Sequence, residues 1–237
     1  MGQGYAHTGS NPFRWGELDE RGHDAPSGRT VPRAPRDWRR IVREGERRAK
    51  AGDAHALDAL VGALRWRYDT ARNTAVDALA GLGPRAETRL LSVLASAETA
   101  VERRAAADAL ARMQSRAAVP LLIRSLQDPN MVVRRSAAKA LLDLRVRDAV
   151  PRIARLLRDE SGGVRVLAAG VLGRFGDRSA VPALVRALRD ERWYVRQAAA
   201  RSLGELDDDR ARAALRRAVD DPRPAVVQAA KEALLRL

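Results

Sequence analysis

The chain has 237 residues and a net charge of +14 at pH 7, so it is long enough for one or two ordinary domains or one elongated repeat array, and it favours acidic partners. Hydrophobic residues make up 46% of the chain but aromatic residues only 4%, and the apolar content is mainly Ala, Leu and Val, which favours closely packed helices over a sheet core. The lack of cysteine excludes disulfides, thiolate metal sites and cysteine nucleophiles, and no apolar run approaches the roughly 18 residues needed to span a bilayer.

The N-terminal segment, residues 1–36, is rich in Gly, Pro, Ser and Asn and shows no periodicity, which predicts a disordered or extended arm. It has no apolar signal core, so we expect the protein to be cytoplasmic. One apolar cluster, residues 11–18, either packs on the first helices as a lid or forms a short docking motif. We favour the lid, because exposed Phe and Trp side chains are costly to leave in water.

Residues 37–52 predict a single helix that caps the rest of the chain. Asp37 is a suitable N-cap, Trp38, Ile41 and Val42 supply the apolar side chains, and Gly52 ends the helix. The helix lacks the leucine column of the segments that follow. Because terminal units of a repeat array are atypical, we predict an N-terminal capping helix.

Residues 53–237 repeat with a period of 31. Leucine recurs at this spacing in six segments, and Ala, Arg and Asp form parallel columns. The leucines are Leu79, Leu110, Leu141, Leu172, Leu203 and Leu234. A fixed period of this length is typical of solenoids, whose units bury their apolar faces against their neighbours. We predict six units, at about 53–83, 84–114, 115–145, 146–176, 177–207 and 208–237.

Each unit reads as two short helices joined by turns, as residues 177–207 illustrate. Val181, Leu184 and Leu188 share one helical stripe, and Pro182 suits the first turn of that helix. Asp190 lies in the turn before a second helix. Helices of about 10 to 12 residues are marginal alone in water, so stacking must stabilise the array.

Pro, Asp and Arg recur at offsets of 0, +8 and +14. Three units carry the complete set: Pro120, Asp128, Arg134; Pro151, Asp159, Arg165; and Pro182, Asp190, Arg196. With the flanking sequence AVPALVRALRDERWYVRQAAARSLGEL, this pattern resembles HEAT-repeat proteins, in the short 31-residue form first named in phycobilin lyases. The resemblance implies an all-α fold, a right-handed α-solenoid (superhelix) of about six stacked helix pairs. The second unit departs most, with Ala97 where others have Asp.

The resemblance also implies a structural role for the Asp and Arg columns. In such repeats the turn Asp and the Arg at +14 form a ladder between successive units, where a guanidinium is paired with a turn carboxylate. The ladder residues are Asp128, Arg134, Asp159, Arg165, Asp190 and Arg196. We therefore expect them to stabilise the fold rather than bind a ligand.

The sequence supports no catalytic, cofactor or metal site. The three histidines, His7, His23 and His55, lie in the arm or at the start of the first unit, and no His-Glu dipeptide occurs. Phosphate-binding glycine loops are absent, and the repeat serines lack a nearby histidine base. We therefore predict a protein that is not an enzyme.

The variable columns of the second helices predict a binding surface. In stacked helix pairs these helices line the concave face, and Trp193 and Tyr194 open one of them beside a gap at Gly162 and Gly163. Exposed Trp, Tyr and Arg are common interface anchors, although the rings could simply cover helix ends. The predicted protein-binding residues are Arg104, Arg135, Lys139, Arg174, Trp193, Tyr194, Gln197 and Arg201.

A regular arginine stripe on the first helices predicts a second surface on the convex face. It consists of Arg124, Arg155, Arg186 and Arg217. Such a stripe could follow phosphates, but it more often only solvates a surface. The leading hypothesis is a non-enzymatic scaffold that binds another protein through the concave face and the rim at Trp193. A protein partner is favoured over nucleic acid because the concave columns mix both charges, and we expect it to be acidic where it meets the basic residues of that face. The alternatives are a largely sequence-independent nucleic-acid binder and a lyase-like chaperone subunit, the last suggested by the resemblance alone.

Overall fold

A computed structural model describes residues 32–237 of the chain, which form α-helices and short 3-10 turns without any strand. The first helix, α1 (Trp38–Lys50), precedes six helix pairs. The first helices of the pairs are α2 (Ala54–Gly62), α4 (Pro84–Ser96), α6 (Val119–Ser125), α8 (Val150–Arg155), α10 (Val181–Ala187) and α12 (Arg212–Ala218). The second helices are α3 (Asp69–Gly81), α5 (Ala100–Arg112), α7 (Met131–Asp143), α9 (Gly162–Phe175), α11 (Trp193–Leu206) and α13 (Pro224–Leu234).

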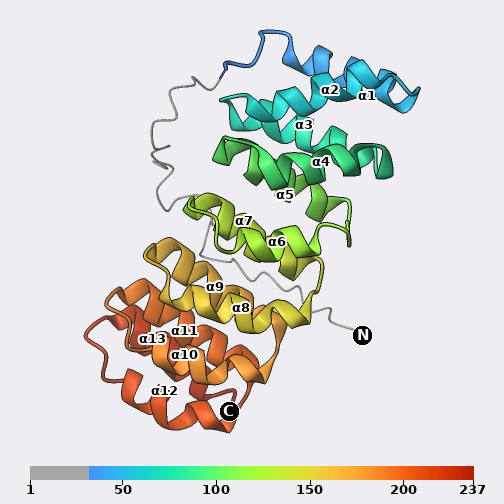
Figure 1. The fold of residues 1–237 in the computed structure, drawn as a ribbon. Helices are drawn as coiled ribbons and strands as arrows, with labels where there is room; N and C mark the ends of the chain where they lie inside the picture. The colour runs from blue at the N-terminus through green and yellow to red at the C-terminus, as the bar shows by residue number, and fades with distance from the viewer. Residues whose placement is uncertain (1–31) are drawn as a thin grey trace, which may run out of the picture.

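The helix pairs stack along one axis, from α1 at one end to α12 and α13 at the other (Figure 1). Each second helix packs on the second helix of the next pair, so α3, α5, α7, α9, α11 and α13 form a continuous inner layer. The first helices form the outer layer. This arrangement confirms the predicted all-α solenoid. None of the helices in residues 32–237 combines the length and apolar content needed to cross a bilayer.

Alanine and leucine columns of the second helices form the core between the layers. The alanines Ala75, Ala106, Ala137, Ala168, Ala199 and Ala230 are fully buried. Leucines Leu79, Leu110, Leu141, Leu172 and Leu203 are also fully buried, whereas Leu234, in the last helix, is only partly so. Small alanines let neighbouring helices approach, and each leucine fills the space left between them. The core is therefore a series of similar contacts, one per unit.

The outer helices differ between the two ends of the array. α4 is one continuous helix of 13 residues that begins at Pro84, whereas α6, α8, α10 and α12 have six or seven residues. A 3-10 turn precedes each of the last three. Proline opens α6, α8 and α10 within their first turn, where its missing N–H costs nothing. The unit that departs from the repeat in sequence thus also departs in helix length.

The capping helix α1 packs against α2 and α3. Asp37 precedes it but makes no capping hydrogen bond; its carboxylate instead accepts from Arg40 Nη2 at 2.7 Å. The chain before α1 is tied to the first pair, because the Arg67 N–H donates to the Pro32 carbonyl at 2.8 Å. The predicted arm and its apolar cluster lie almost entirely outside the described residues.

Candidate binding surfaces of the solenoid

The Asp and Arg columns form a series of bidentate ion pairs along one edge of the stack. Arg134 donates from Nε and Nη2 to both carboxylate oxygens of Asp159, each at 2.7 Å. Arg165 makes the same contacts with Asp190, at 2.8 and 3.0 Å. Two further rungs, Arg103–Asp128 and Arg196–Asp221, have Nε–Oδ2 distances of 2.7 and 2.6 Å. Each rung therefore joins one unit to the next.

Each ladder arginine also closes the turn of its own unit. Arg134 Nη1 donates to the carbonyls of Asp128 and Pro129 at 2.9 and 3.0 Å, and the other three ladder arginines repeat this pattern. The turn aspartates accept in addition from the backbone N–H two residues on, at 2.9 Å in Asp159. With these donors and acceptors satisfied inside the fold, the ladder has little capacity left for a ligand.

The first rung is missing, because Ala97 stands where the other units have Asp. Arg72 is 5% exposed and donates from Nη1 to the Trp66 carbonyl at 2.6 Å; its Nη2 pairs with Asp69, which is half exposed. Burial, with a contribution from Arg104, lowers the pKa of Arg72 to about 10. The guanidinium is thus held less favourably than those in the complete rungs.

A cluster of charged residues occupies the inner layer where α3, α5 and α7 meet. Arg104 lies near two carboxylates, with Nε 3.7 Å from Asp108 and Nη1 3.8 Å from Asp69. Burial raises the pKa of Asp108, which Arg104, a hydrogen bond with Ser136 and Lys139 each counteract. Burial and then Arg104 lower the pKa of Arg135. Arg104, Arg135 and Lys139 therefore belong to one site. Asp108 and Ser136 are also part of it, although the sequence did not single them out as binding residues.

A second charged cluster lies on the inner layer at the C-terminal end. Burial raises the pKa of Glu205, while Arg236, Arg174 and Arg201 act in the opposite direction. The predicted residues Arg174 and Arg201 are thus close to one carboxylate. They belong to α9 and α11, away from the cluster around Arg104.

Gln197, on α11, is only 6% exposed, so its predicted outward position on the concave face is wrong. Val166, in the same column, is 3% exposed. The physical reason is the close packing of α9 and α11: a Cβ added at Gly173 would lie 2.8 Å from Ser202 Oγ. Helices that approach this closely cover side chains that a wider spacing would leave open.

The aromatic residues of the rim lie at the start of α11. Trp193 is 38% exposed and packs edge to face on Tyr194, with ring centroids 5.8 Å apart. The Tyr194 hydroxyl occupies the space beside Gly162, 2.6 Å from where a Cβ would be. Trp66, by contrast, packs against the core. Of the pair, Trp193 is therefore the more exposed ring, although most of its surface is covered.

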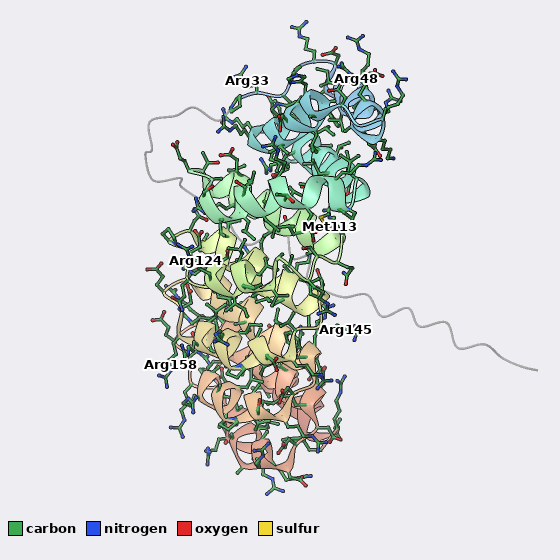
Figure 2. The ribbon with its side chains drawn as sticks, turned by 45° about the vertical axis from the view of Figure 1, so that its right-hand side comes forward. Arg33, Arg48, Met113, Arg124, Arg145 and Arg158 are labelled. Carbon is green, nitrogen blue, oxygen red and sulfur yellow. The ribbon has the colours of Figure 1, made fainter. Side chains whose placement is uncertain are left out.

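The arginine stripe of the outer layer is exposed along its length, at Arg124, Arg155, Arg186 and Arg217. Figure 2 shows Arg124 and Arg158 on one side of the stack and Met113 and Arg145 on the other. Within residues 32–237 the guanidinium groups of the stripe arginines make no hydrogen bond or ion pair. They are therefore free of the internal pairing that holds the ladder arginines.

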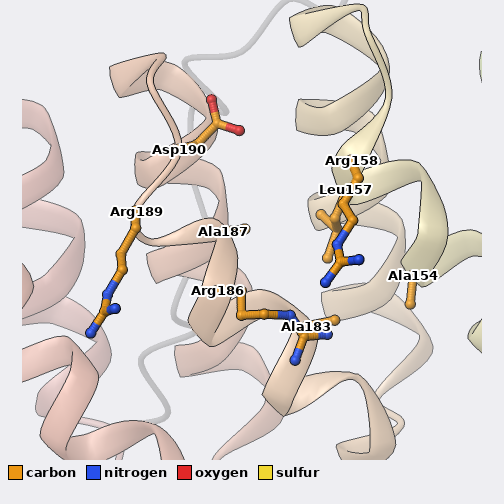
Figure 3. Close-up of a pocket in the computed structure, with 8 residues that line it drawn as sticks. All are labelled: Ala154, Leu157, Arg158, Ala183, Arg186, Ala187, Arg189 and Asp190. Carbon is orange, nitrogen blue, oxygen red and sulfur yellow. The ribbon is translucent and has the colours of Figure 1, made fainter.

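A shallow groove of about 200 Å³ lies between α8 and α10 on this outer layer. The side chains of Arg158 and Arg186 extend over it, and Arg189 also lines it (Figure 3). Arg158 and Arg189 are 31 residues apart in a column that holds Gln127 and Asp220 in the neighbouring units. In these two units the stripe is therefore joined by a second arginine, a feature that the repeat spacing could have revealed.

Among the described residues, no group of three or more His, Asp or Glu side chains is arranged to hold a metal ion. Two carboxylates, Asp108 and Glu205, have pKa values that burial raises. Arginine surrounds both, joined by Lys139 at Asp108, and no histidine in residues 32–237 acts on either carboxylate. The arrangement suits recognition of charge.

Comparisons with known proteins identify the fold. The profile of HEAT repeats matches residues 87–165 and 149–235, and no curated protein matches the chain. Among solved structures, the E. coli protein YibA is 24% identical, with a TM-score of 0.54 over 77% of this chain and 69% of that one. A designed armadillo repeat protein in complex with the peptide (KR)4 is 18% identical, with a TM-score of 0.53 over 76% and 98%.

A complex of CpcE and CpcF of phycocyanin lyase from Nostoc is 23% identical, with a TM-score of 0.43 over 84% of this chain and 81% of that chain. At these identities the likenesses to YibA and to the designed protein show the fold alone. The HEAT profile, however, spans more than half of the chain and agrees with the stacked pairs and their period of 31 residues. The chain belongs to the HEAT-repeat family.

Proposed function

We propose that the protein is a non-enzymatic scaffold that binds an extended, acidic segment of another protein along its inner layer. The observation that carries this proposal is the contrast between two sets of arginines. The ladder arginines are fully paired, whereas Arg104 and Lys139 act on one carboxylate, Asp108, without a hydrogen bond to it, and the buried Nε of Arg135 has no hydrogen-bond partner. Incompletely paired cations on a rigid surface favour an anionic partner.

Two further observations support a peptide-like partner. The designed armadillo protein, which has a similar fold, is in complex with the charged peptide (KR)4, so a repeat fold of this kind is able to hold a charged peptide. Here the inner layer carries an excess of cations around Arg104 and Arg135, which favours acidic side chains instead. The partly exposed ring of Trp193 at the rim offers an apolar contact as well.

The test is the binding of a fluorescent octapeptide, (Glu-Ser)4, whose carboxylates all project from one side when it is extended. Changing Arg135, Lys139 and Arg201 together to Glu should weaken binding by about tenfold or more, because three attractive contacts become repulsive. Fluorescence anisotropy measures the affinity. The neutral peptide (Gln-Ser)4 should not bind.

A matched triple variant separates location from net charge. Changing Arg124, Arg155 and Arg186 to Glu alters the net charge by the same amount on the outer layer. Peptide affinity in this variant should stay within about twofold of wild type, since those side chains lie beyond the Debye length of about 8 Å from an inner-layer peptide. Equal losses in both triple variants would refute the proposed location.

A second candidate function is nucleic-acid binding along the outer stripe, favoured by the groove where Arg158 and Arg186 lie together. It requires that a single-stranded oligonucleotide such as dT12 binds and that its affinity falls steeply with salt. The logarithm of the affinity should fall by about 0.7 per phosphate contacted for each tenfold rise in salt concentration. The outer triple variant would then lose dT12 binding and the inner one would keep it. Failure of wild type to bind dT12 at low salt excludes this function.

A further inference from the structure

Arg104, on the second of three successive inner helices, lies within electrostatic reach of an arginine on each of the other two. Arg72 belongs to α3, Arg104 to α5 and Arg135 to α7. Arg104 acts on both of the others, and after burial it is the group that lowers the pKa of each. Arginines brought together in this way repel one another, and nothing in the ladder explains why the fold retains them.

Arg135 is the least satisfied of the three. Its Nε is buried and has no hydrogen-bond partner among the described residues, the only side-chain nitrogen or oxygen there of which this is true. Arg134, the preceding residue, shows what a satisfied guanidinium looks like in this fold, because each of its nitrogens donates to a carboxylate or carbonyl. Buried polar atoms are almost always paired, so an exception points to a missing partner.

Arg104 is incompletely satisfied as well. Its distances of 3.7 Å to Asp108 and 3.8 Å to Asp69 exceed the range of a hydrogen bond. Asp69 already pairs with Arg72, and Asp108 interacts with Ser136 and Lys139 as well. Two carboxylates are therefore shared among Arg72, Arg104 and Lys139, and with Arg135 beside Arg104 the cluster keeps an excess of positive charge.

We propose that Arg104 and Arg135 form a receptor for one carboxylate, that of an acidic side chain in the extended segment of the partner protein. This inference rests on the proposed function and identifies the residues that would hold one side chain of the partner. A planar carboxylate accepts two hydrogen bonds from a guanidinium fork, and an ion held between two forks would satisfy the buried Nε of Arg135 and neutralise its repulsion with Arg104.

The depth of the site favours a carboxylate on a flexible side chain over a phosphodiester. Arg135 Nε is buried, so a ligand reaches it only when the guanidinium turns toward the surface. A carboxylate on a flexible Glu or Asp side chain can follow that movement, whereas a phosphodiester is confined to the backbone of its strand.

The decisive variant is Arg135→Lys, which keeps the charge but removes the planar fork. If the fork binds a carboxylate, the affinity for (Glu-Ser)4 falls by about tenfold. General attraction to a basic surface predicts no change. Arg152→Lys, the same substitution on the exposed outer side of α8, is the matched control and should bind the peptide as wild type does.

A second variant tests the receptor without any ligand. Arg135→Met keeps the unbranched stem and removes both the unpaired Nε and the repulsion with Arg104. It should bind (Glu-Ser)4 at least as weakly as Arg135→Lys does, and yet the free protein should melt higher by about 2 °C or more. A lower melting temperature would show that the guanidinium stabilises the fold, which contradicts the receptor.

The outcomes separate the receptor from the function on which it rests. If Arg135→Lys binds as wild type does while the inner triple variant loses binding, the receptor is wrong and the proposed function stands. If wild type does not bind (Glu-Ser)4, both are wrong. If Arg135→Lys loses dT12 binding rather than peptide binding, the site recognises phosphate, which also overturns the proposal.

Discussion

The carboxylate of each turn aspartate contributes to two units at once. Asp159 accepts two hydrogen bonds from Arg134 of the preceding unit and one from the N–H of Ser161 in its own turn. Glu160, the next residue, also contacts Arg134 at 3.2 Å but is 83% exposed, and exposed ion pairs contribute little. The difference between these neighbouring carboxylates shows that burial and bidentate geometry decide which contact stabilises the array.

Restoring the missing rung should stabilise the protein. Ala97 has backbone angles of −64° and 136°, close to the −62° and 147° of Asp159, so an aspartate there would be placed to accept from Arg72. We expect Ala97→Asp to raise the free energy of unfolding by about 2 kcal/mol, and Tm by roughly 4 to 8 °C. Ala97→Asn, which lacks the charge, should change Tm little. Thermal unfolding followed by circular dichroism measures both; an unchanged Tm in Ala97→Asp would mean that Trp66 and Asp69 already satisfy Arg72.

At the scale of the helix, small residues determine how closely successive inner helices approach. Gly204 of α11 faces α13 so closely that an added Cβ would lie 2.8 Å from the Ala233 Cα. Gly62, at the end of α2, has helical angles and open space around the position of its missing Cβ. One glycine is thus required by packing, whereas the other only adds backbone freedom to the unfolded chain.

The two glycines should respond in opposite directions to alanine. Gly204→Ala forces α13 to move and should lower the free energy of unfolding by about 1 to 3 kcal/mol. Gly62→Ala should raise it by about 0.5 to 1 kcal/mol, because it removes backbone entropy from the unfolded state. Urea unfolding of the two variants beside wild type provides the comparison. Equal effects would show that the contact of α11 with α13 adapts freely.

Over the whole molecule, acidic groups are perturbed in two opposite directions. Arg196 holds the pKa of Asp221 below its usual range, and Arg210 lowers that of Asp208 to about 2. Burial raises the pKa values of Asp108 and Glu205. A depressed pKa means that the folded state binds fewer protons, so its stabilising effect is present above the ordinary value of about 4 and is lost as pH falls further. A raised pKa has the reverse effect.

Stability should therefore depend on pH in two stages. Between pH 7 and 5, Tm should stay level or rise slightly, because protonation of Asp108 and Glu205 relieves their burial. Below pH 4 it should fall steeply, since Asp208 and Asp221 must be protonated while the arginines remain charged. Asp221→Asn should have a lower Tm at pH 7 and a shallower fall below pH 4. A Tm that declines steadily from pH 7 would contradict this assignment of the groups.

The repeat made most of the fold predictable. Its period of 31 residues, the alanine and leucine columns and the turn prolines depend on contacts within a unit and with its nearest neighbour, and these contacts recur in the same form. The all-α solenoid is confirmed for this reason. The binding surface stays a prediction. The repeat columns show which side of a helix a residue occupies, but they do not show how closely successive inner helices pack.

The sequence by itself determined the helix pairs, their stacking order and the side of each helix that faces the core, because these follow from local periodicity. Only the tertiary structure decided that Gln197 is covered, that Asp108 and Ser136 join Arg104, and that Arg135 Nε is buried without a partner. These features depend on the distances between helices, which the sizes of side chains in separate units set together. No single column of the repeat contains that information.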